Sequence, residues 1–192
     1  ARAILRRLGA NPFQQKENEC QVTGVFLDMN ELWEQFLLQT LFRGMAGHSV
    51  QQSRDVLGGH MTIRPDFLWE DKGVVLDAKY RQIWESALRL DGKWSGGLSS
   101  EEQKALRENV YQVLAYMLLC GCADGGMIFP VRSSWKCSLT SRIFDPVGPA
   151  GQRFWRVPVR IPEAQSYEDF LTEMEREANR LRNLEVIRKI RA

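Results

Sequence analysis

The chain has 192 residues, of which 44% are hydrophobic and 26% are charged, and its formal net charge at pH 7 is +2. This length allows one substantial core, and so small a net charge excludes a generally basic surface as the basis of any nucleic-acid binding. No apolar run approaches the length of a membrane span and no signal peptide is recognisable, so we expect a cytoplasmic protein with no membrane association.

The N-terminal region gives little structural signal. The chain begins with Ala-Arg-Ala and not with methionine, so we expect a fragment of a longer protein. Residues 1–24 are predicted to be a connecting segment, and residues 25–192 a single domain. Four cysteines, at positions 20, 120, 122 and 137, do not have zinc-ligand spacing and are predicted to be free thiols.

The first predicted helix runs from Asp28 to about Phe42. Its opening residues, Asp28-Met-Asn-Glu31, have the spacing of a capping box. Most apolar side chains of this helix fall on one broad arc, and Glu34 falls inside that arc. A carboxylate on a core-facing side is costly unless it is paired, protonated or bound to a metal. Glu34 is therefore either an acid of a metal site or a buried acid paired with an arginine such as Arg64.

Two β-type runs follow, and they carry the most informative residues of the chain. Asp66 lies near the end of the run Met61–Trp69, and a glycine turn leads into the apolar run Val74–Tyr80, which carries Asp77 and Lys79. Alternate side chains of a strand point to one face, so the latter two share a side. A hairpin then brings Asp66 beside Asp77.

This arrangement predicts a metal site. Two neighbouring carboxylates raise each other's pKa unless a cation lies between them, and hard oxygen ligands favour magnesium or manganese. Lys79 could orient or help to deprotonate an attacking water and offset charge that develops on a phosphate. The alternative is an ordinary salt bridge between Asp77 and Lys79, with Asp66 as a turn or capping residue.

A second helix is predicted from about residue 101 to residue 120, opened by the capping box Ser99-Ser-Glu-Glu102. Asn109, Gln112 and Tyr116 form a polar stripe on an otherwise apolar half of this helix. Such a stripe can hydrogen-bond a phosphate or hold the lysine. It can equally be a buried polar network that serves the fold.

The last third of the chain predicts two strands and a helix. Residues 138–144 and 153–161 have strand character, and Pro158 favours an edge position. A helix begins at Ser166, and the basic end Arg188–Arg191 suits a helix C-terminus. The expected fold class is α/β, with a mixed central sheet flanked by helices and the acids at one edge of the sheet.

The order of these motifs resembles a known family of nucleases. Asp66, Asp77-Ala-Lys79 and Gln112-Val-Leu-Ala-Tyr116 are similar to the motifs of the PD-(D/E)xK superfamily, including the Gln-x-x-x-Tyr helix of its RecB-like branch. A narrower resemblance is to McrC-type nuclease subunits of modification-dependent McrBC restriction systems. Five segments carry it: Phe26–Phe36, Arg64–Asp66, Leu76–Tyr80, Tyr111–Tyr116 and Gly126–Pro130.

The resemblance implies a PD-(D/E)xK restriction-endonuclease-like fold and metal-dependent hydrolysis of DNA phosphodiester bonds, with Mg²⁺ as cofactor and Mn²⁺ as a substitute. It implies the metal ligands Asp66, Asp77, the backbone carbonyl of Ala78 and Glu34, the catalytic lysine Lys79, and the supporting residues Gln112 and Tyr116. It also implies a separate AAA+ GTPase motor of the McrB type as partner, because this chain has no P-loop motif. Dimerisation would serve double-strand cleavage.

Two other functions fit parts of the pattern. A RecB-like repair exonuclease shares the Gln112–Tyr116 motif and would differ by a preference for DNA ends. A catalytically silent DNA-binding or assembly module could keep the fold, although the complete set of acids with Lys79 argues against it. Residues 83–99 match no part of the resemblance.

Overall fold

The computed structural model describes residues 28–43, 49–50, 53–80, 98–134, 144–147 and 151–191. The predicted connecting segment, residues 1–24, and nearly all of the unmatched segment, residues 83–99, lie outside these ranges. In the described part of the chain, none of the helices combines the length and hydropathy that crossing a membrane would require.

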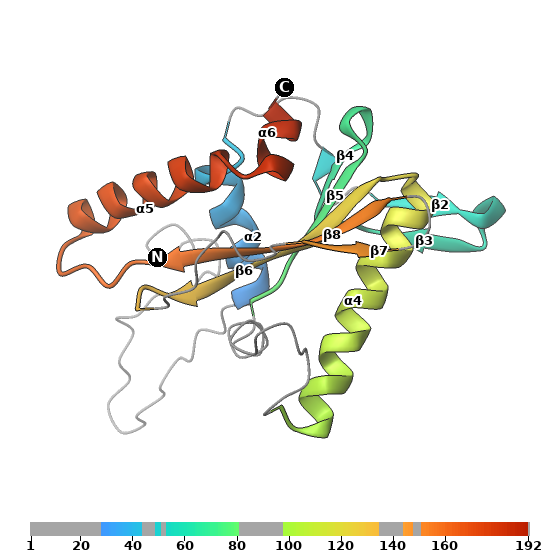
Figure 1. Cartoon of the computed structure of the whole chain (residues 1–192), viewed down its shortest axis with the longest axis horizontal. Helices are drawn as coiled ribbons and strands as arrows, with labels where there is room; N and C mark the ends of the chain where they lie inside the picture. The colour runs from blue at the N-terminus through green and yellow to red at the C-terminus, as the bar shows by residue number, and fades with distance from the viewer. Residues whose placement is uncertain are drawn as a thin grey trace, which may run out of the picture.

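A six-stranded mixed sheet forms the centre of the protein (Figure 1). In spatial order its strands are β1 (Ser49–Val50), β4 (Phe67–Trp69), β5 (Val74–Ala78), β6 (Asp124–Arg132), β8 (Gln152–Ile161) and β7 (Phe144–Val147). The β5–β6 and β6–β8 pairs are parallel, and the β1–β4, β4–β5 and β7–β8 pairs are antiparallel. Strands β5 and β6 are central and consist almost wholly of buried residues, as expected for strands covered on both faces.

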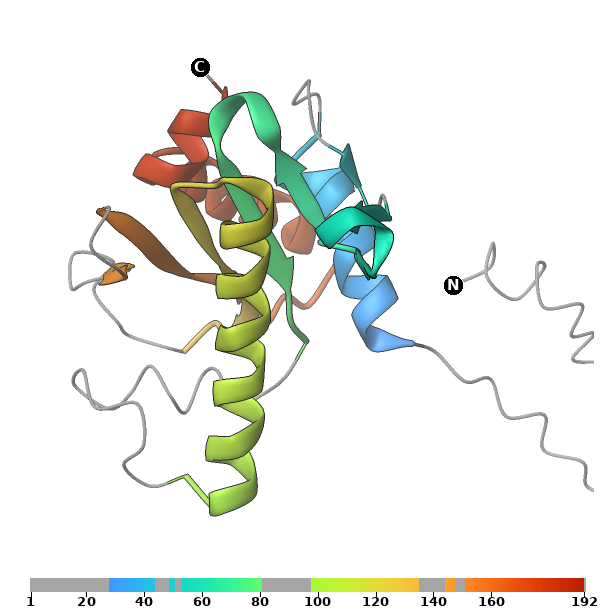
Figure 2. The same ribbon diagram turned by 90° about the vertical axis from the view of Figure 1, so that its right-hand side faces the viewer.

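Helices cover both faces of the sheet. On one face lie α2 (Met29–Thr40), α5 (Tyr167–Arg182) and α6 (Glu185–Arg191), whose apolar side chains form one core with β5 and β8. On the other face lies α4 (Ser100–Cys120), which forms a second core with other side chains of the same sheet (Figure 2). The α/β class with a mixed sheet flanked by helices is thus confirmed.

Capping and close packing fix α4 against the sheet. The predicted capping box is present, because the Ser99 hydroxyl accepts the Glu102 N–H and the Glu102 carboxylate accepts the Ser99 N–H. The helix ends at Gly121, whose φ of 67° is the left-handed conformation that glycine adopts readily. A Cβ on Gly125 would lie 2.3 Å from Cγ of Met117. The glycine therefore lets α4 approach β6 closely.

Strand character in the run Met61–Trp69 was predicted correctly, but its continuity was not. The structure divides it into β3 (Met61–Ile63) and β4, which belong to different sheets. Strand β3 pairs with β2 (Arg54–Val56) in a separate hairpin. Pro65 lies in the break, where its missing N–H removes a ladder donor. Asp66 consequently precedes β4.

The C-terminal region also departs from the prediction in two places. The chain from Ser166 forms two helices and not one, with the break at Asn183 and Leu184. Of the strand predicted over residues 138–144, only the last residue is described, as the start of β7. Pro158 lies in β8, which has neighbours on both sides, but the described β7 residues pair only with Gln152–Trp155.

Candidate active site

Asp66 and Asp77 are neighbours across the β4–β5 pair. The register places Phe67 opposite Leu76, so the position before Phe67 lies beside Asp77. Oδ2 of Asp66 accepts a hydrogen bond from the Ala78 N–H at 2.7 Å. The predicted proximity of the two aspartates is therefore present in the structure, and the Asp66 carboxylate is held against the end of β5.

The backbone of Ala78 faces the Asp66 carboxylate. In an extended strand the N–H and C=O of one residue point to the same side, so the Ala78 carbonyl follows its N–H toward Asp66. The next residue is fixed from the other side, because the Lys79 N–H donates to the Ile128 carbonyl at 2.9 Å. The backbone at the end of β5 is thereby held between β4 and β6.

Lys79 and Asp77 lie on one face, as their spacing predicts. Lys79 Nζ is 2.7 Å from Oδ2 of Asp77, whose residue is 1% exposed. The Asp77 carboxylate also interacts with the Asp66 side chain, so one ammonium group serves two neighbouring carboxylates. A simple salt bridge would pair one acid with one base. Here the negative charge of the second carboxylate is not fully offset.

Burial makes both carboxylates poor acids. Burial raises the pKa of Asp66, although the Ala78 hydrogen bond and the Lys79 charge oppose the rise. Burial, together with the negative charge of Asp66, raises the pKa of Asp77 to about 7, while the positive charge of Lys79 opposes the rise. Two such carboxylates beside a lysine are the electrostatic pattern of a cation site or an acid–base site.

The raised pKa predicts an unusual pH dependence of stability for the metal-free protein. Asp77 titrates near pH 7 when folded and near 3.8 when unfolded, so its stabilising contribution is complete below about pH 4 and is lost as the pH rises through 7. Relative to Asp77→Asn, we expect the wild-type free energy of unfolding to fall by about 2–4 kcal/mol across that range. Urea unfolding in chelator at about pH 4.5 and pH 8 measures this difference. Parallel pH dependences of the two proteins would contradict it.

Gln112 and Tyr116 join the site through the segment that carries Asp66. Gln112 Nε2 donates to the Tyr116 hydroxyl at 2.9 Å, and that hydroxyl donates to the Arg64 carbonyl at 3.4 Å. The charges of Asp77, Asp66 and Lys79 all influence the Tyr116 hydroxyl, whose pKa is raised chiefly by burial. The polar stripe on α4 therefore faces the site. Its visible action is to position the backbone two residues before Asp66.

Glu34 is buried on α2, as its place in the apolar arc predicts. Its helix packs on the sheet face opposite α4, whereas Asp77 and Lys79 influence Tyr116 on the α4 side. Among the described residues, no group of three His, Cys, Asp or Glu side chains is arranged to hold a metal ion. The structure thus brings together Asp66 and Asp77, and the predicted role of Glu34 at the metal stays a prediction.

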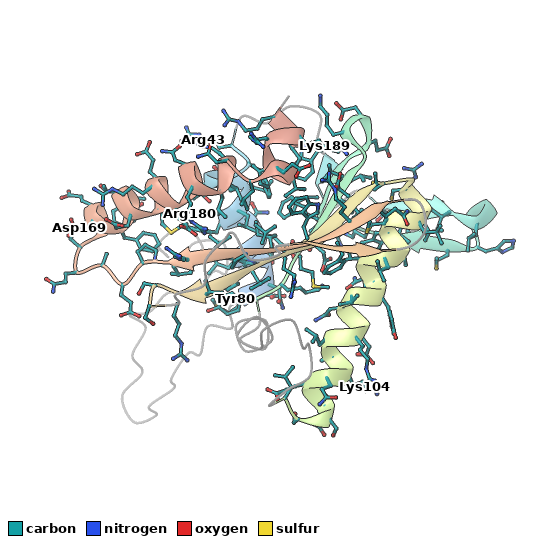
Figure 3. All side chains as sticks on the ribbon, in the orientation of Figure 1. Arg43, Tyr80, Lys104, Asp169, Arg180 and Lys189 are labelled. Atoms are coloured by element: carbon teal, nitrogen blue, oxygen red, sulfur yellow. The ribbon has the colours of Figure 1, made fainter. Side chains whose placement is uncertain are left out.

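One contact that fixes α2 near the site was not predicted from the sequence. Trp33 Nε1 donates to the Ile128 carbonyl at 3.2 Å, the same oxygen that accepts the Lys79 N–H. Trp33 also lies near Tyr80, with ring centroids 6.5 Å apart (Figure 3 labels Tyr80 at the end of β5). One carbonyl therefore links the helix that carries Glu34 to the strand that carries Lys79. A tryptophan beside a glutamate carries no sequence signal for such a contact.

A family model described as "McrBC 5-methylcytosine restriction system component" matches residues 1–130. The chain belongs to this family. The match covers Asp66, Asp77, Lys79 and the polar stripe of α4, so the resemblance to the McrBC system inferred from the motifs is confirmed.

A solved structure is also similar to the McrBC-family chain. It is a chain of the refined half-complex from a tetradecameric assembly of Thermococcus gammatolerans McrB AAA+ hexamers with bound McrC, with 21% identity and a TM-score of 0.44. The similarity covers 82% of the present chain and 34% of that chain, so the present chain spans about a third of its length. The comparison with curated proteins gives no match.

Proposed function

We propose that this McrBC-family chain is a metal-dependent DNA endonuclease with a PD-(D/E)xK fold, and that it is the cleavage component of its restriction system. The observation that carries the proposal is the arrangement of half-buried Asp66, held by the Ala78 N–H, beside buried Asp77, whose carboxylate lies 2.7 Å from Nζ of Lys79. Membership of a restriction family supports DNA as the substrate.

The residues present fit a hard divalent cation such as Mg²⁺ or Mn²⁺. Two carboxylates and a backbone carbonyl are hard oxygen donors, and a cation between the carboxylates would offset the repulsion by which Asp66 raises the pKa of Asp77. Asp66, Asp77 and the Ala78 carbonyl would hold the ion, and Glu34 as a further ligand stays a prediction. A cation bound there would polarise the scissile phosphate and lower the pKa of an attacking water.

The side chains around the acids have distinct roles in this proposal. Lys79 offsets the negative charge that develops on the phosphate and helps to orient the water, since its ammonium group lies beside Asp77. Tyr116 and Gln112 are positioning residues, because their hydrogen bonds fix the Arg64 carbonyl and hence the approach of Asp66. The acids are thereby held in place before substrate binds.

We also propose a AAA+ GTPase motor of the McrB type as partner and methylcytosine-containing DNA as target. The family description names 5-methylcytosine restriction, and the sequence lacks the phosphate-binding loop that a motor needs. The motor and the reading of the modified base would then belong to other polypeptides or domains. Two copies of the nuclease acting together would give a double-strand break.

Nicking of supercoiled plasmid tests the proposed activity. The chain should convert methylated plasmid to the open-circular form in Mn²⁺ or Mg²⁺, alone or with its AAA+ partner, and chelator should abolish the conversion. Covalently closed relaxed or single-stranded circles, which have no ends, separate an endonuclease from an exonuclease. A folded protein that binds no divalent cation and cleaves nothing with the partner present would overturn the proposal.

A further inference from the structure

The β2–β3 hairpin ends in an apolar tip that the core does not use. It projects beside the six-stranded sheet (Figure 1), and its four connecting residues are Leu57, two glycines and His60. Leu57 is 63% exposed, and Met61 is also exposed. The tip from Val56 to Thr62 contains no Asp, Glu, Lys or Arg.

The backbone of the tip is held in a conformation that leucine disfavours. Leu57 has a φ of 52°, and the following glycines, Gly58 and Gly59, have φ values of 68° and 87°. A non-glycine residue in the left-handed region is uncommon, and a leucine there is disfavoured relative to glycine. Leu57 gains no burial in return, which makes the strained, exposed leucine a candidate for binding.

The base of the hairpin is anchored, so the tip has a defined position. Val56 and Ile63 are buried in the core that contains α4. Arg54 forms an ion pair with Glu70, and Thr62 donates to Asp55 at 2.8 Å. The tip is therefore a fixed projection and not a loose loop.

The hairpin leads directly into the candidate active site. Asp66 follows Met61 by five positions. At an extended rise of about 3.3 Å per residue, their Cα atoms are at most roughly 17 Å apart. The Arg64 carbonyl in this link accepts a hydrogen bond from Tyr116. At about 3.4 Å per base step, the tip can reach DNA within roughly five steps of a phosphate held at Asp66.

We propose that Leu57 and Met61 at this tip insert into the minor groove of the DNA duplex beside the scissile phosphate. The proposal rests on the proposed function and adds how the substrate is held. Leucine and methionine are among the residues that proteins place in this groove as apolar wedges. The uncharged tip does not repel phosphates, and a Cβ on Gly59 would meet nothing within 4 Å, so backbone can approach closely there.

A protein partner fits the tip less well. A stable protein interface buries about 800 Å² on each side, and this tip offers two apolar side chains with glycines between them. Two-stranded ribbons can follow a DNA groove, and single apolar side chains at such a position can enter between base steps in the minor groove. DNA is therefore the occupant that the observations favour.

Fluorescence anisotropy with a short duplex, in chelator to prevent cleavage, tests the inference. Leu57→Ala removes the side chain and keeps the unfavourable backbone, whereas Leu57→Gly removes both. We expect each variant to lose roughly tenfold in affinity with an unchanged dependence of affinity on salt, since no phosphate contact is lost. Leu57→Gly should unfold in urea at the wild-type midpoint or above it. Leu171→Ala, at a leucine 47% exposed on α5, should change neither affinity nor midpoint.

Four results would overturn the inference. The first is a Leu57→Ala variant that binds DNA with wild-type affinity, and the second is a DNA affinity that depends less on salt in the Leu57 variants than in wild type. The third is a lowered urea midpoint in both Leu57 variants. The fourth is a Leu57 variant that loses binding to the AAA+ partner but keeps its affinity for DNA. If the wild-type chain and Leu57→Ala nick plasmid equally well, the proposed insertion of Leu57 is overturned and the proposed nuclease function is not. A wild-type chain that neither binds the duplex nor nicks plasmid with its partner overturns the proposed function as well.

Discussion

Replacing Asp77 with asparagine will abolish the proposed metal-dependent DNA cleavage and leave the fold intact. The change removes one of the two negative charges, those of Asp66 and Asp77, that would hold the cation. It also places a neutral amide beside Lys79, whose ammonium nitrogen lies 2.7 Å from the Asp77 carboxylate in the wild type. We expect cleavage to fall by roughly a thousandfold or more. Plasmid nicking measures this loss, and calorimetric titration with Mn²⁺ should show weakened cation binding in the same variant.

The stability of Asp77→Asn separates a site effect from damage to the fold. Burial raises the pKa of Asp77 to about 7, so at pH 8 the folded wild type holds an unfavourable charge that asparagine lacks. The metal-free variant should therefore be at least as stable as wild type while it is inactive. Asp71→Asn is the matched control, because Asp71 is an exposed acid in the same hairpin. Cleavage that survives in Asp77→Asn would remove the assigned mechanism.

Replacing Asp124 with alanine will destabilise the protein more than any surface change. This carboxylate is 1% exposed and accepts hydrogen bonds from Arg153 at 2.7 and 3.0 Å, Trp155 at 2.7 Å and Lys189 at 2.8 Å. Lys189 reaches it from α6 (Figure 3). Removing the anion takes an acceptor from the Trp155 N–H and from two partly buried cations. Lys189 loses this ion pair and Arg153 keeps the more exposed Glu185, and the cost is about 3–5 kcal/mol. Urea unfolding at pH 7 measures the loss.

Two comparisons make the Asp124 result interpretable. Glu108→Ala removes an exposed helix pair with Lys104, 3.9 Å long, and should cost less than about 1 kcal/mol. Burial alone would raise the pKa of Asp124, but its hydrogen bonds from Arg153, Lys189 and Trp155 outweigh burial and lower it. The contribution of Asp124 is thus present at neutral pH and is lost as the pH falls. An Asp124→Ala protein as stable as Glu108→Ala would show that the network does not hold the sheet.

Local rules were sufficient for the parts of the site that depend on near neighbours. The Asp28 cap of α2 and the Ser99 capping box of α4 were predictable from side chains three residues apart. The shared face of Asp77 and Lys79 follows from the alternation of a strand. Gly73 predicted the turn of the hairpin that brings Asp66 beside β5, and in the structure it has the left-handed conformation that glycine adopts readily.

The features that could not be predicted from the sequence depend on contacts between residues that are distant in the chain. The run that contains Asp66 splits because β3 pairs with β2 whereas β4 pairs with β5, and strand propensity does not name a partner. Glu34 has the burial that its helical position predicts. Whether it reaches the aspartates depends on the sheet face on which α2 packs. Asp124 lies between an alanine and a glycine, and its cations follow 29 and 65 residues later.

The Asp124 network also bears on how the chain folds as it is synthesised. Strand β6 pairs in parallel with β8, and the buried carboxylate at its start meets Lys189 only after 65 further residues have been made. Contacts so distant in sequence form slowly, and an unpaired central strand is prone to aggregate while it waits. Folding of the sheet is therefore completed late, when α6 has left the ribosome and docked, and chaperones have a long interval in which to bind the nascent chain.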